Sequence, residues 1–584
     1  MTQPLLDIQH LSVNYGHHQA LHDLDLQVEP GEIVGIVGES GSGKSTLIQT
    51  IMGLLDTEGC VTAGSVLFGN NPPVCLTNLS ERELRTYRGA SLALMMQDPY
   101  ATFSPVRTIG SQFKQVLTAH RSQLQGKFEG GKSAGGKSVG EKSTGWKSAG
   151  WRACACETLR RVGLDDPQTI LKSYPFELSG GMCQRASLAL ALAQKPALLL
   201  ADEPTSALDV AVQVQVIREL LGVRAQLQCG MLVVSHNIGM MVRLADRIAV
   251  LHEGRLVEMG SPSNLINNPQ HAYTRSLIQA IPQFGKKLPS QDTSGGSASH
   301  DQPVADGSAS HDQPVVDGSA SNHQPVADMS YSCTAPLLTI ENVTKTYRGM
   351  AQPALRDVSM SITRGECVGL VGGSGSGKST LARLILNLEE PDQGNIVYQG
   401  TNLGMLKGKD RRAYYSHVQM VFQNHVGSFD PHQTLGASVR EFGCNFGLSR
   451  NQAQEKAERL FRQVGLSIDL FERYPHEVSG GQCQRAAIAR ALMANPELLV
   501  CDEMTSALDV SVQAALVDTL ARLKNDMTIL FISHDLALVD MLCDRTIVMH
   551  DGVIVEQGMT HELIRHAQHP YTKQLIESAS HDHL

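Results

Sequence analysis

A glycine-rich loop of one fixed pattern occurs twice in this chain of 584 residues. Residues 38–45 read Gly-Glu-Ser-Gly-Ser-Gly-Lys-Ser, and residues 372–379 read Gly-Gly-Ser-Gly-Ser-Gly-Lys-Ser. Each loop follows a short apolar run, residues 33–37 or 367–371, and leads into a helical pattern. A strand, a loop of the form G-x-x-x-x-G-K-[ST] and a helix together predict a phosphate-binding P-loop. Two copies about 330 residues apart therefore predict two α/β units of the same kind.

Each loop brings together the groups that hold the phosphates of a nucleotide. Glycines allow successive backbone N–H groups to turn toward one anion, and the helix that begins at Lys44 presents its partly positive end there. Lys44 adds a full charge near the β- and γ-phosphates, and the Ser45 hydroxyl is placed to hold Mg²⁺. Lys378 and Ser379 occupy the same places in the second loop. The other residues expected to contact phosphate are Gly38, Gly41, Gly43 and Thr46 in the first loop and Gly372, Gly375, Gly377 and Thr380 in the second.

Two fully apolar segments later in the halves each end in a pair of carboxylates, Asp202–Glu203 and Asp502–Glu503. Uninterrupted apolar runs are expected for central strands of a parallel sheet. The first acid of each pair suits Mg²⁺ binding through water, and the second suits a general base toward an attacking water. We therefore predict a hydrolytic centre beside each glutamate.

Further signals recur at matching places in the two halves. They are a tyrosine before the P-loop, a glutamine after a buried strand, a Ser-Gly-Gly helix start and a histidine at a strand end. In the first half these residues are Tyr15, Gln97, Ser179, Gly180, Gly181 and His236. In the second half they are Tyr347, Gln423, Ser479, Gly480, Gly481 and His534. The tyrosine is either a half-buried sheet residue or a platform for adenine. The helix start is either an ordinary N-cap or an anion-binding site, and its pairing with a P-loop favours anion binding. Each histidine is a candidate sensor of the γ-phosphate.

The composition narrows the class of protein. Apolar residues make up 42% of the chain, and the net charge of −9 argues against nucleic acid as the main partner. The first residues have neither the basic nor the apolar region of a signal peptide, and no run of about 18 apolar residues predicts a membrane span. The twelve cysteines lack zinc-type spacing and favour reduced thiols in a cytosolic compartment.

Two low-complexity tracts interrupt the repeated pattern. Residues 126–150 form five pentapeptides rich in Gly, Ser and Lys. The glutamine and the helix-opening serine are 82 positions apart in the first half and 56 in the second, so this tract accounts for nearly the whole difference. We predict a solvated insertion in a surface loop rather than a lipid or phosphate patch. Residues 286–335 contain three eleven-residue repeats and predict a flexible linker, whose spaced histidines would bind a divalent ion only weakly.

The ordered motifs resemble a tandem ATP-binding-cassette (ABC) ATPase over about residues 5–283 and 336–579. They are the Walker A loop, the Q-loop glutamine, the SGG signature, the Walker B acids, the D-loop sequence Ser-Ala-Leu-Asp at 206–209 and 506–509, and the switch histidine. The resemblance implies two P-loop NTPase cassettes, each with a mainly parallel core sheet, an antiparallel β subdomain and a helical signature subdomain. The predicted domains are residues 1–285 and 336–584, joined by the linker.

The resemblance also implies that the halves face head to tail, so that each ATP lies between the P-loop of one half and the signature of the other. Site one would use Tyr15, Gly43, Lys44, Ser45, Gln97, Asp202, Glu203 and His236, closed by Ser479, Gly480 and Gly481. Site two would use Tyr347, Gly377, Lys378, Ser379, Gln423, Asp502, Glu503 and His534, closed by Ser179, Gly180 and Gly181. Mg²⁺ would be held by Ser45, Gln97 and Asp202, and by Ser379, Gln423 and Asp502. Both sites keep the glutamate and histidine, so two hydrolytic sites are predicted, although Met504 replaces the usual proline beside the second glutamate.

The sequences at the ends of the two halves resemble one particular group of ABC ATPases. Residues 268–277 (NPQHAYTRSL) and 568–575 (QHPYTKQL) are similar to the N-P-x-H-P-Y-T tail of peptide/nickel importer ATPases. This implies an energy-coupling subunit at the cytoplasmic face of the inner membrane, with two permease subunits and an extracytoplasmic binding protein as partners. The implied cargo is a small peptide, nickel or a metal chelate. Some members carry a cysteine cluster after the first tail, but no cysteine lies between Cys229 and Cys333, so we predict no iron–sulfur cluster.

Two other classes of protein share part of the motif set. Soluble tandem ATPases that act on ribosomes or DNA join their cassettes by a charged helical linker, whereas this linker is a Gly/Ser/His repeat. Accessory ATPases of phosphonate breakdown share the signatures. The two tails favour the importer over the ribosome-associated class.

Overall fold

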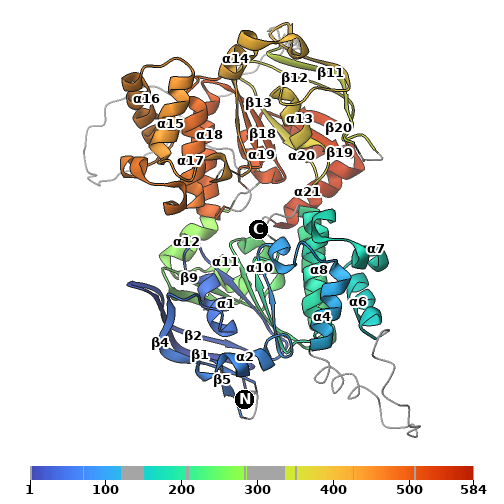
Figure 1. Cartoon of the computed structure of the whole chain (residues 1–584), viewed down its shortest axis with the longest axis vertical. Coiled ribbons are helices and arrows are strands. Elements are labelled where there is room, and N and C mark those ends of the chain that lie inside the picture. The colour runs from blue at the N-terminus through green and yellow to red at the C-terminus, as the bar shows by residue number, and fades with distance from the viewer. Residues whose placement is uncertain are drawn as a thin grey trace, which may run out of the picture.

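The repeated sequence pattern folds into two halves of the same construction, one stacked on the other (Figure 1). The structure is a computed structural model that describes residues 3–69, 72–119, 150–205, 210–281, 284–285, 336–348, 352–424, 426–505 and 508–582. The predicted linker and all but the last residue of the predicted insertion lie outside the described residues, as does the first D-loop, residues 206–209.

A six-stranded sheet forms the centre of the first half. Its order is β10-β9-β3-β8-β7-β6, and every neighbouring pair is parallel except β9 and β10. The strands are β3 (Ile33–Val37), β6 (Leu92–Met95), β7 (Leu198–Asp202), β8 (Gly230–Ser235), β9 (Arg247–His252) and β10 (Arg255–Gly260). All of β3 and β8 is buried, which explains their uninterrupted apolar sequences.

An antiparallel sheet and a group of helices cover the two faces of this core sheet. The antiparallel sheet has the order β2-β1-β4-β5 and consists of β1 (Leu6–Tyr15), β2 (His18–Val28), β4 (Gly59–Phe68) and β5 (Val74–Cys75). The helices are α1 (Lys44–Met52), α2 (Glu81–Tyr87), α3 (Pro99–Thr102), α4 (Ile109–Ala119), α6 (Gly150–Arg161), α7 (Pro167–Lys172), α8 (Gly180–Ala193), α9 (Val210–Leu227), α10 (Ile238–Leu244), α11 (Pro262–Asn267) and α12 (Ala272–Gln279). One apolar core joins the antiparallel sheet and α1 to one face, and a second joins α4, α6 and α8 to the other.

The second half repeats this construction. Its core sheet, in the order β16-β17-β18-β13-β19-β20, consists of β13 (Cys367–Val371), β16 (Val418–Val421), β17 (Leu498–Asp502), β18 (Thr528–Ser533), β19 (Arg545–His550) and β20 (Val553–Met559). The antiparallel sheet consists of β11 (Leu338–Lys345), β12 (Leu355–Ile362), β14 (Gln393–Tyr398) and β15 (Thr401–Asn402). The helices are α13 (Lys378–Ile385), α14 (Gly408–His417), α15 (Leu435–Asn445), α16 (Arg450–Gln463), α17 (Gly480–Leu492), α18 (Val510–Lys524), α19 (Leu536–Leu542), α20 (Thr560–His566) and α21 (Pro570–Asp582). The predicted fold class, with its three structural parts in each half, is therefore confirmed.

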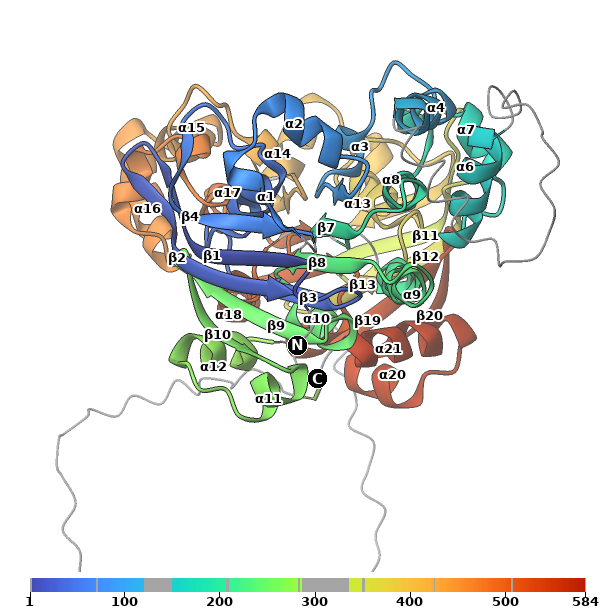
Figure 2. The same ribbon diagram turned by 90° about the horizontal axis from the view of Figure 1, so that it is seen from below.

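The two halves are stacked head to tail. In Figure 1 the helical part of the second half, α15 to α17, stands over α1 of the first half, and the helical part of the first half stands under α13 and α21. Figure 2, turned by 90°, shows the same pairing. Contacts cross the boundary in both directions, since the N–H of Gly285 donates to Asp540 Oδ2 at 2.7 Å, while α21 contacts α9 and α10.

No helix within the described ranges is long and apolar enough to cross a membrane.

Candidate functional site

The order of the core strands brings the predicted motifs to one edge of the sheet. In the first half β3 pairs with β8, β8 with β7, and β7 with β6, all in parallel. The carboxyl ends of these strands carry the P-loop, His236, the acids Asp202 and Glu203, and Gln97. Ligands of open α/β sheets bind at this edge, so each half contains one candidate nucleotide site.

The P-loop wraps around the Lys44 side chain. Gly41 and Gly43 adopt φ values of +82° and +99°, a left-handed conformation that glycine reaches without a Cβ penalty. Gly43 caps α1, which begins at Lys44. The buried Lys44 Nζ donates to the carbonyl oxygens of Gly38 and Glu39 at 2.8 and 2.7 Å. In the second loop Lys378 Nζ makes the same two bonds, to Gly372 and Gly373, at 2.9 Å each.

The charge of Lys44 is set by its burial and by surrounding acids. Burial lowers the pKa of Lys44, and the carboxylates of Asp509, Glu203 and Asp202 oppose this shift. Asp509 belongs to the second half, so the electrostatic environment of the first P-loop already includes both halves. A cation enclosed by carboxylates and loop carbonyls is placed to meet an anionic phosphate.

Two side chains fix the Glu203 carboxylate. Gln97 Nε2 donates to Glu203 Oε2 at 2.8 Å, and His236 Nδ1 lies 3.0 Å from Oε1. Burial acts to raise the pKa of Glu203, but the His236 contact, the Lys44 charge and the Gln97 bond outweigh it, so the pKa is lowered and the carboxylate is ionised. These three predicted residues are therefore brought together.

The second half places its glutamate in a similar way. Gln423 Nε2 donates to Glu503 Oε2 at 2.9 Å, and Lys378 Nζ lies 3.7 Å from Oε1. His534 follows β18 at the position that matches His236. The carbonyl of Met504 accepts a bond from Gln484, as that of Pro204 does from Gln184, so the replacement of proline preserves this backbone contact.

Sequence reasoning missed the backbone conformation of the two glutamates. Glu203 and Glu503 adopt φ values of +47° and +42°, which are uncommon for a residue with a Cβ. Their N–H groups donate to Val234 and Ile532 of the neighbouring strand at 2.8 and 2.9 Å, and this holds the conformation. Strained backbone of this kind is concentrated at functional sites, and no sequence pattern announces it.

The neighbouring aspartates have the properties of a cation site. Burial raises the pKa values of Asp202 and Asp502, and side-chain bonds from Ser45 and Ser379 lower them in part. Asp502 Oδ1 is buried and has no hydrogen-bond partner among the described residues. A buried carboxylate oxygen beside a serine hydroxyl fits an oxygen-preferring divalent cation such as Mg²⁺.

The two signature serines act as helix caps. Ser179 Oγ accepts from Met182 N and Ser479 Oγ accepts from Gln482 N, both at 3.3 Å, at the starts of α8 and α17. Both serines therefore cap their helices, while anion binding by the same helix ends, which the sequence favoured, stays a prediction. A Cβ on Gly481 would lie 2.2 Å from Val512 Cγ1, so close packing against α18 also requires a glycine there.

The end of the second D-loop and the start of α18 contact the P-loop of the first half. Asp509 Oδ2 accepts from the Ser40 N–H at 2.9 Å, and Ser511 Oγ donates to Glu39 Oε1 at 2.6 Å. The D-loop motif pointed to Asp509, whereas nothing in the repeated pattern pointed to Glu39 or Ser511. Sequence reasoning also missed the tail tyrosine Tyr273, whose hydroxyl accepts from the Glu39 N–H at 3.0 Å.

The tyrosines before the P-loops bond to a residue on the P-loop helix in the first half and to a residue just after that helix in the second. Tyr15 Oη donates to Gln49 Oε1 at 3.1 Å, and Tyr347 Oη donates to Glu389 Oε2 at 2.6 Å. Both residues are half-buried; Tyr15 ends strand β1, as the sheet interpretation expects, whereas Tyr347 lies two residues beyond the end of β11. A stacking role toward adenine stays a prediction.

Comparisons with known proteins give the following likenesses. A family model described as "ABC transporter" matches residues 21–206 and 355–506, and one described as "Oligopeptide/dipeptide transporter, C-terminal region" matches residues 257–305 and 555–581. The chain is 35% identical over 589 residues to the glutathione import ATP-binding protein GsiA of Salmonella typhimurium strain LT2, and 34% identical over 585 residues to that of Escherichia coli O157:H7. Each alignment covers 98% of this chain and 89% of the relative.

Solved structures similar to this chain cover somewhat less than half of it. One is cbiO1 from Clostridium perfringens, part of the ABC transporter complex cbiONQ, with a TM-score of 0.37 and 26% identity over 40% of this chain and 91% of that one. Another is the ATP-binding cassette MJ0796 in a post-hydrolysis state bound to ADP and Pi, with a TM-score of 0.35 and 27% identity over 38% of this chain and 98% of that one.

Proposed function

This chain belongs to the ABC transporter family as an importer ATPase, and from that premise we propose that its two halves together hydrolyse MgATP to drive the import of a short peptide. Its importer role implies permease partners in the membrane. The GsiA relatives are named as import proteins, which supports the importer role over the soluble tandem ATPase alternative. The observation that carries the proposal is the head-to-tail contact of Asp509 with the P-loop that holds Lys44.

In the proposed mechanism each half supplies one set of hydrolytic residues. The ionised Glu203 is held from two sides by Gln97 and His236, so its carboxylate can orient an attacking water and accept its proton. Lys44 and the P-loop N–H groups would hold the phosphates, and catalysis would consist mainly of positioning and charge stabilisation. Mg²⁺ bound by Ser45 and Asp202, with Gln97 nearby, would neutralise negative charge on the phosphates. Glu503 and its neighbours would do the same in site two.

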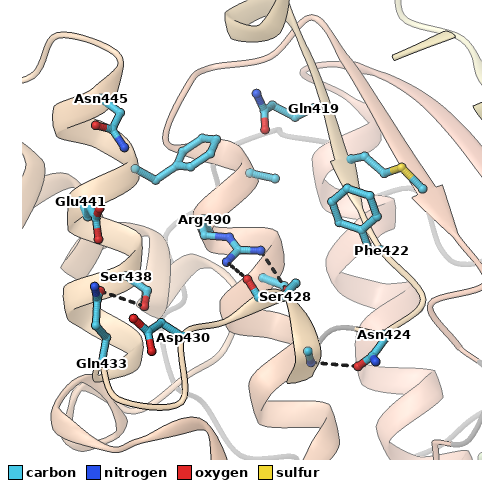
Figure 3. A pocket seen from close by; sticks show the side chains of 15 residues that line it. Gln419, Phe422, Asn424, Ser428, Asp430, Gln433, Ser438, Glu441, Asn445 and Arg490 are labelled. Carbon is cyan, nitrogen blue, oxygen red and sulfur yellow. Dashed lines mark hydrogen bonds between the residues drawn. The ribbon is translucent and has the colours of Figure 1, made fainter. Parts of the chain in front are cut away.

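We assign the docking of a permease to the groove beside the Q-loop glutamine. In the second half a cavity of about 720 Å³ lies between the end of β16 and the helices α15 and α17 (Figure 3). Phe422 is 43% exposed at its edge, and Arg490 donates to the carbonyl and hydroxyl of Ser428 at its floor. A partly apolar groove next to Gln423 would let a permease segment sense closure of the site, and would place the chain at the membrane surface.

The proposed cargo is a short peptide delivered by an extracytoplasmic binding protein. Support comes from the match of both tails to the oligopeptide/dipeptide transporter region and from relatives named for glutathione import. Nickel and metal chelates, which the tail resemblance also allowed, are the competing cargo.

The test is ATPase activity of the chain reconstituted in lipid nanodiscs with its permease partners and its binding protein. We expect the binding protein loaded with glutathione or a dipeptide to stimulate hydrolysis severalfold, and the Glu203→Gln, Glu503→Gln variant to lose at least about 100-fold because no base orients the water. Stimulation by a nickel–histidine complex alone would overturn the peptide assignment. Cofractionation with ribosomes instead of membranes would overturn the importer role.

A further inference from the structure

The tail of each half is anchored to the strand that precedes it. Both oxygens of Glu258, on β10, accept from the N–H groups of Gln270 and His271 at 2.8 and 2.9 Å. His271 Nδ1 accepts from the N–H of Tyr273 at 3.2 Å and so caps α12. In the second half Glu556, Gln568, His569 and Tyr571 make the same contacts at 2.7, 3.1 and 3.2 Å. The first residues of the tail motif therefore fix where its tyrosine lies.

The tyrosine of each tail reaches the P-loop of its own half. Tyr273 Oη accepts from the Glu39 N–H at 3.0 Å, and Tyr571 Oη accepts from the Gly373 N–H at 2.7 Å. Each ring stacks on the last residue of the neighbouring strand, His252 or His550, with centroids 3.8 and 3.9 Å apart. The ring stacking fixes the position of each tyrosine side chain, and the hydrogen bond joins its hydroxyl to the P-loop.

The hydrogen bond from the P-loop to the tail tyrosine does not depend on which side chain the P-loop residue has. The second residue of the P-loop is Glu39 in one half and Gly373 in the other, yet the tyrosine finds the backbone N–H in both. Burial raises the pKa of Tyr273 to about 12, so its hydroxyl is neutral at physiological pH and adds no charge that would repel a phosphate. The feature that the two halves share is one hydrogen bond from a backbone N–H at the start of the P-loop to the tyrosine oxygen.

We propose that Tyr273 and Tyr571 are positioning residues for nucleotide binding, each of which holds the first turn of its P-loop in the phosphate-binding conformation. A loop that must direct several N–H groups at one anion loses less conformational freedom on binding if it is already held. The tail motif then has a physical role inside the nucleotide site, although none of its residues needs to touch ATP. This inference rests on ATP binding by the chain.

The test is ATP affinity of the full chain by calorimetry in the Glu203→Gln, Glu503→Gln background, where ATP is not hydrolysed. Tyr273→Phe removes one hydroxyl and keeps the ring on His252. We expect about a fivefold weaker Kd at one of the two sites, which corresponds to about 1 kcal/mol, the typical worth of one hydrogen bond. The double variant with Tyr571→Phe should weaken both sites. In the hydrolysing chain the same variants should raise the KM for ATP and leave kcat within about twofold.

The control is Ser276→Ala, which removes from the same helix a hydroxyl that donates to the Tyr273 carbonyl and not to the P-loop among the described residues. It should leave the Kd unchanged. Unchanged affinity in both Tyr→Phe variants would overturn the inference, and so would a loss of affinity accompanied by a fall of more than about 5 °C in Tm, because that would show a general structural role. Failure of the parent chain to bind ATP would overturn the proposed function itself.

Discussion

Glu39 gives the first of the two proposed nucleotide sites a contact between the halves that the second site lacks. Its side chain accepts a bond from Ser511 of the other half at 2.6 Å. The matching positions of the second interface are Gly373 and Ala211, neither of which has a polar side chain. Only site one can therefore contain this contact between the P-loop and the opposite half.

The inequality can be measured with one glutamate active at a time. In the Glu503→Gln background, where only site one hydrolyses, we expect Glu39→Gly or Ser511→Ala to lower turnover about fivefold, because a hydrogen bond to a charged group is lost from the interface. In the Glu203→Gln background the same changes should alter turnover less than about twofold. Equal losses in both backgrounds would contradict an interface contact confined to site one.

At this scale the sequence predicted most of the site residues that recur, although the recurring tail tyrosines Tyr273 and Tyr571 were missed, and it missed those that do not recur. Gln97, Glu203 and His236 were expected together because the same motifs follow the same strands in both halves, and they are in contact. Glu39 and Ser511 are 472 positions apart and have no counterparts of the same type, so no repeat or spacing pointed to them.

Among the elements, α9 of the first half contains a partly buried carboxylate, Glu219, on its side toward the signature helix α8. Burial raises the pKa of Glu219 to about 7, although Arg185 and Gln215 act to lower it. The matching position on α18 is Thr519, whose hydroxyl bonds to the Ala515 carbonyl of its own helix. The two halves therefore differ in charge where the signature helix meets the core.

This carboxylate predicts a pH-dependent stability. Well below pH 4.5 the Glu219 carboxyl is neutral in both the folded and the unfolded chain. As the pH rises from about 4.5 to about 7, the unfolded chain releases the proton first, so folding stability falls. Above pH 7 the full penalty remains. Glu219→Gln should raise Tm by about 2 °C at pH 8, which corresponds to a stability gain on the order of 1 kcal/mol after solvent screening. Well below pH 4.5 it should leave Tm unchanged. Calorimetry at both pH values is the measurement, with the exposed Glu157→Gln as control. A gain of equal size at both pH values would contradict a titrating origin.

The helices that flank the predicted insertion pack on each other. α4 ends at Ala119 and α6 begins at Gly150, and they are in contact, as are α15 and α16, which are joined by only residues 446–449. Deletion of residues 126–149 still leaves six residues to connect the two helices. ATPase activity should then remain within about twofold of the parent, because loop length costs little closure entropy. Loss of expression or activity would show that the tract has a structural role.

Most of the elements could be predicted, because apolar runs of period two and period 3.6 are local signals. The strands that end at the acids and histidines were found in this way, and the observed sheets contain them. The family resemblance predicted a mainly parallel core sheet, but the order of its strands was not predicted, since the pairing of β3 with β8 joins residues about 200 positions apart.

For the whole molecule, the head-to-tail stack predicts that the two sites work together. Lys44→Ala removes the phosphate-binding charge from site one only, yet closure requires both interfaces. We expect total ATPase activity to fall below about one tenth of the parent, because the remaining site is closed by the same movement of the halves. Lys378→Ala should have a matching effect. Residual activity near one half in either variant would mean that the halves turn over independently.

An apolar side chain from each half also packs in the hydrophobic core of the other half. Val510, from the second half, is buried in a cluster built from the first, and Phe284, which follows α12, packs against the main cluster of the second. Such contacts do not depend on bound phosphate. If an engineered protease site within residues 286–335 were cut, the two fragments should still elute from a sizing column as one particle. The covalent joint would then serve to guarantee equal numbers of two unlike partners during synthesis, more than to keep them attached afterwards.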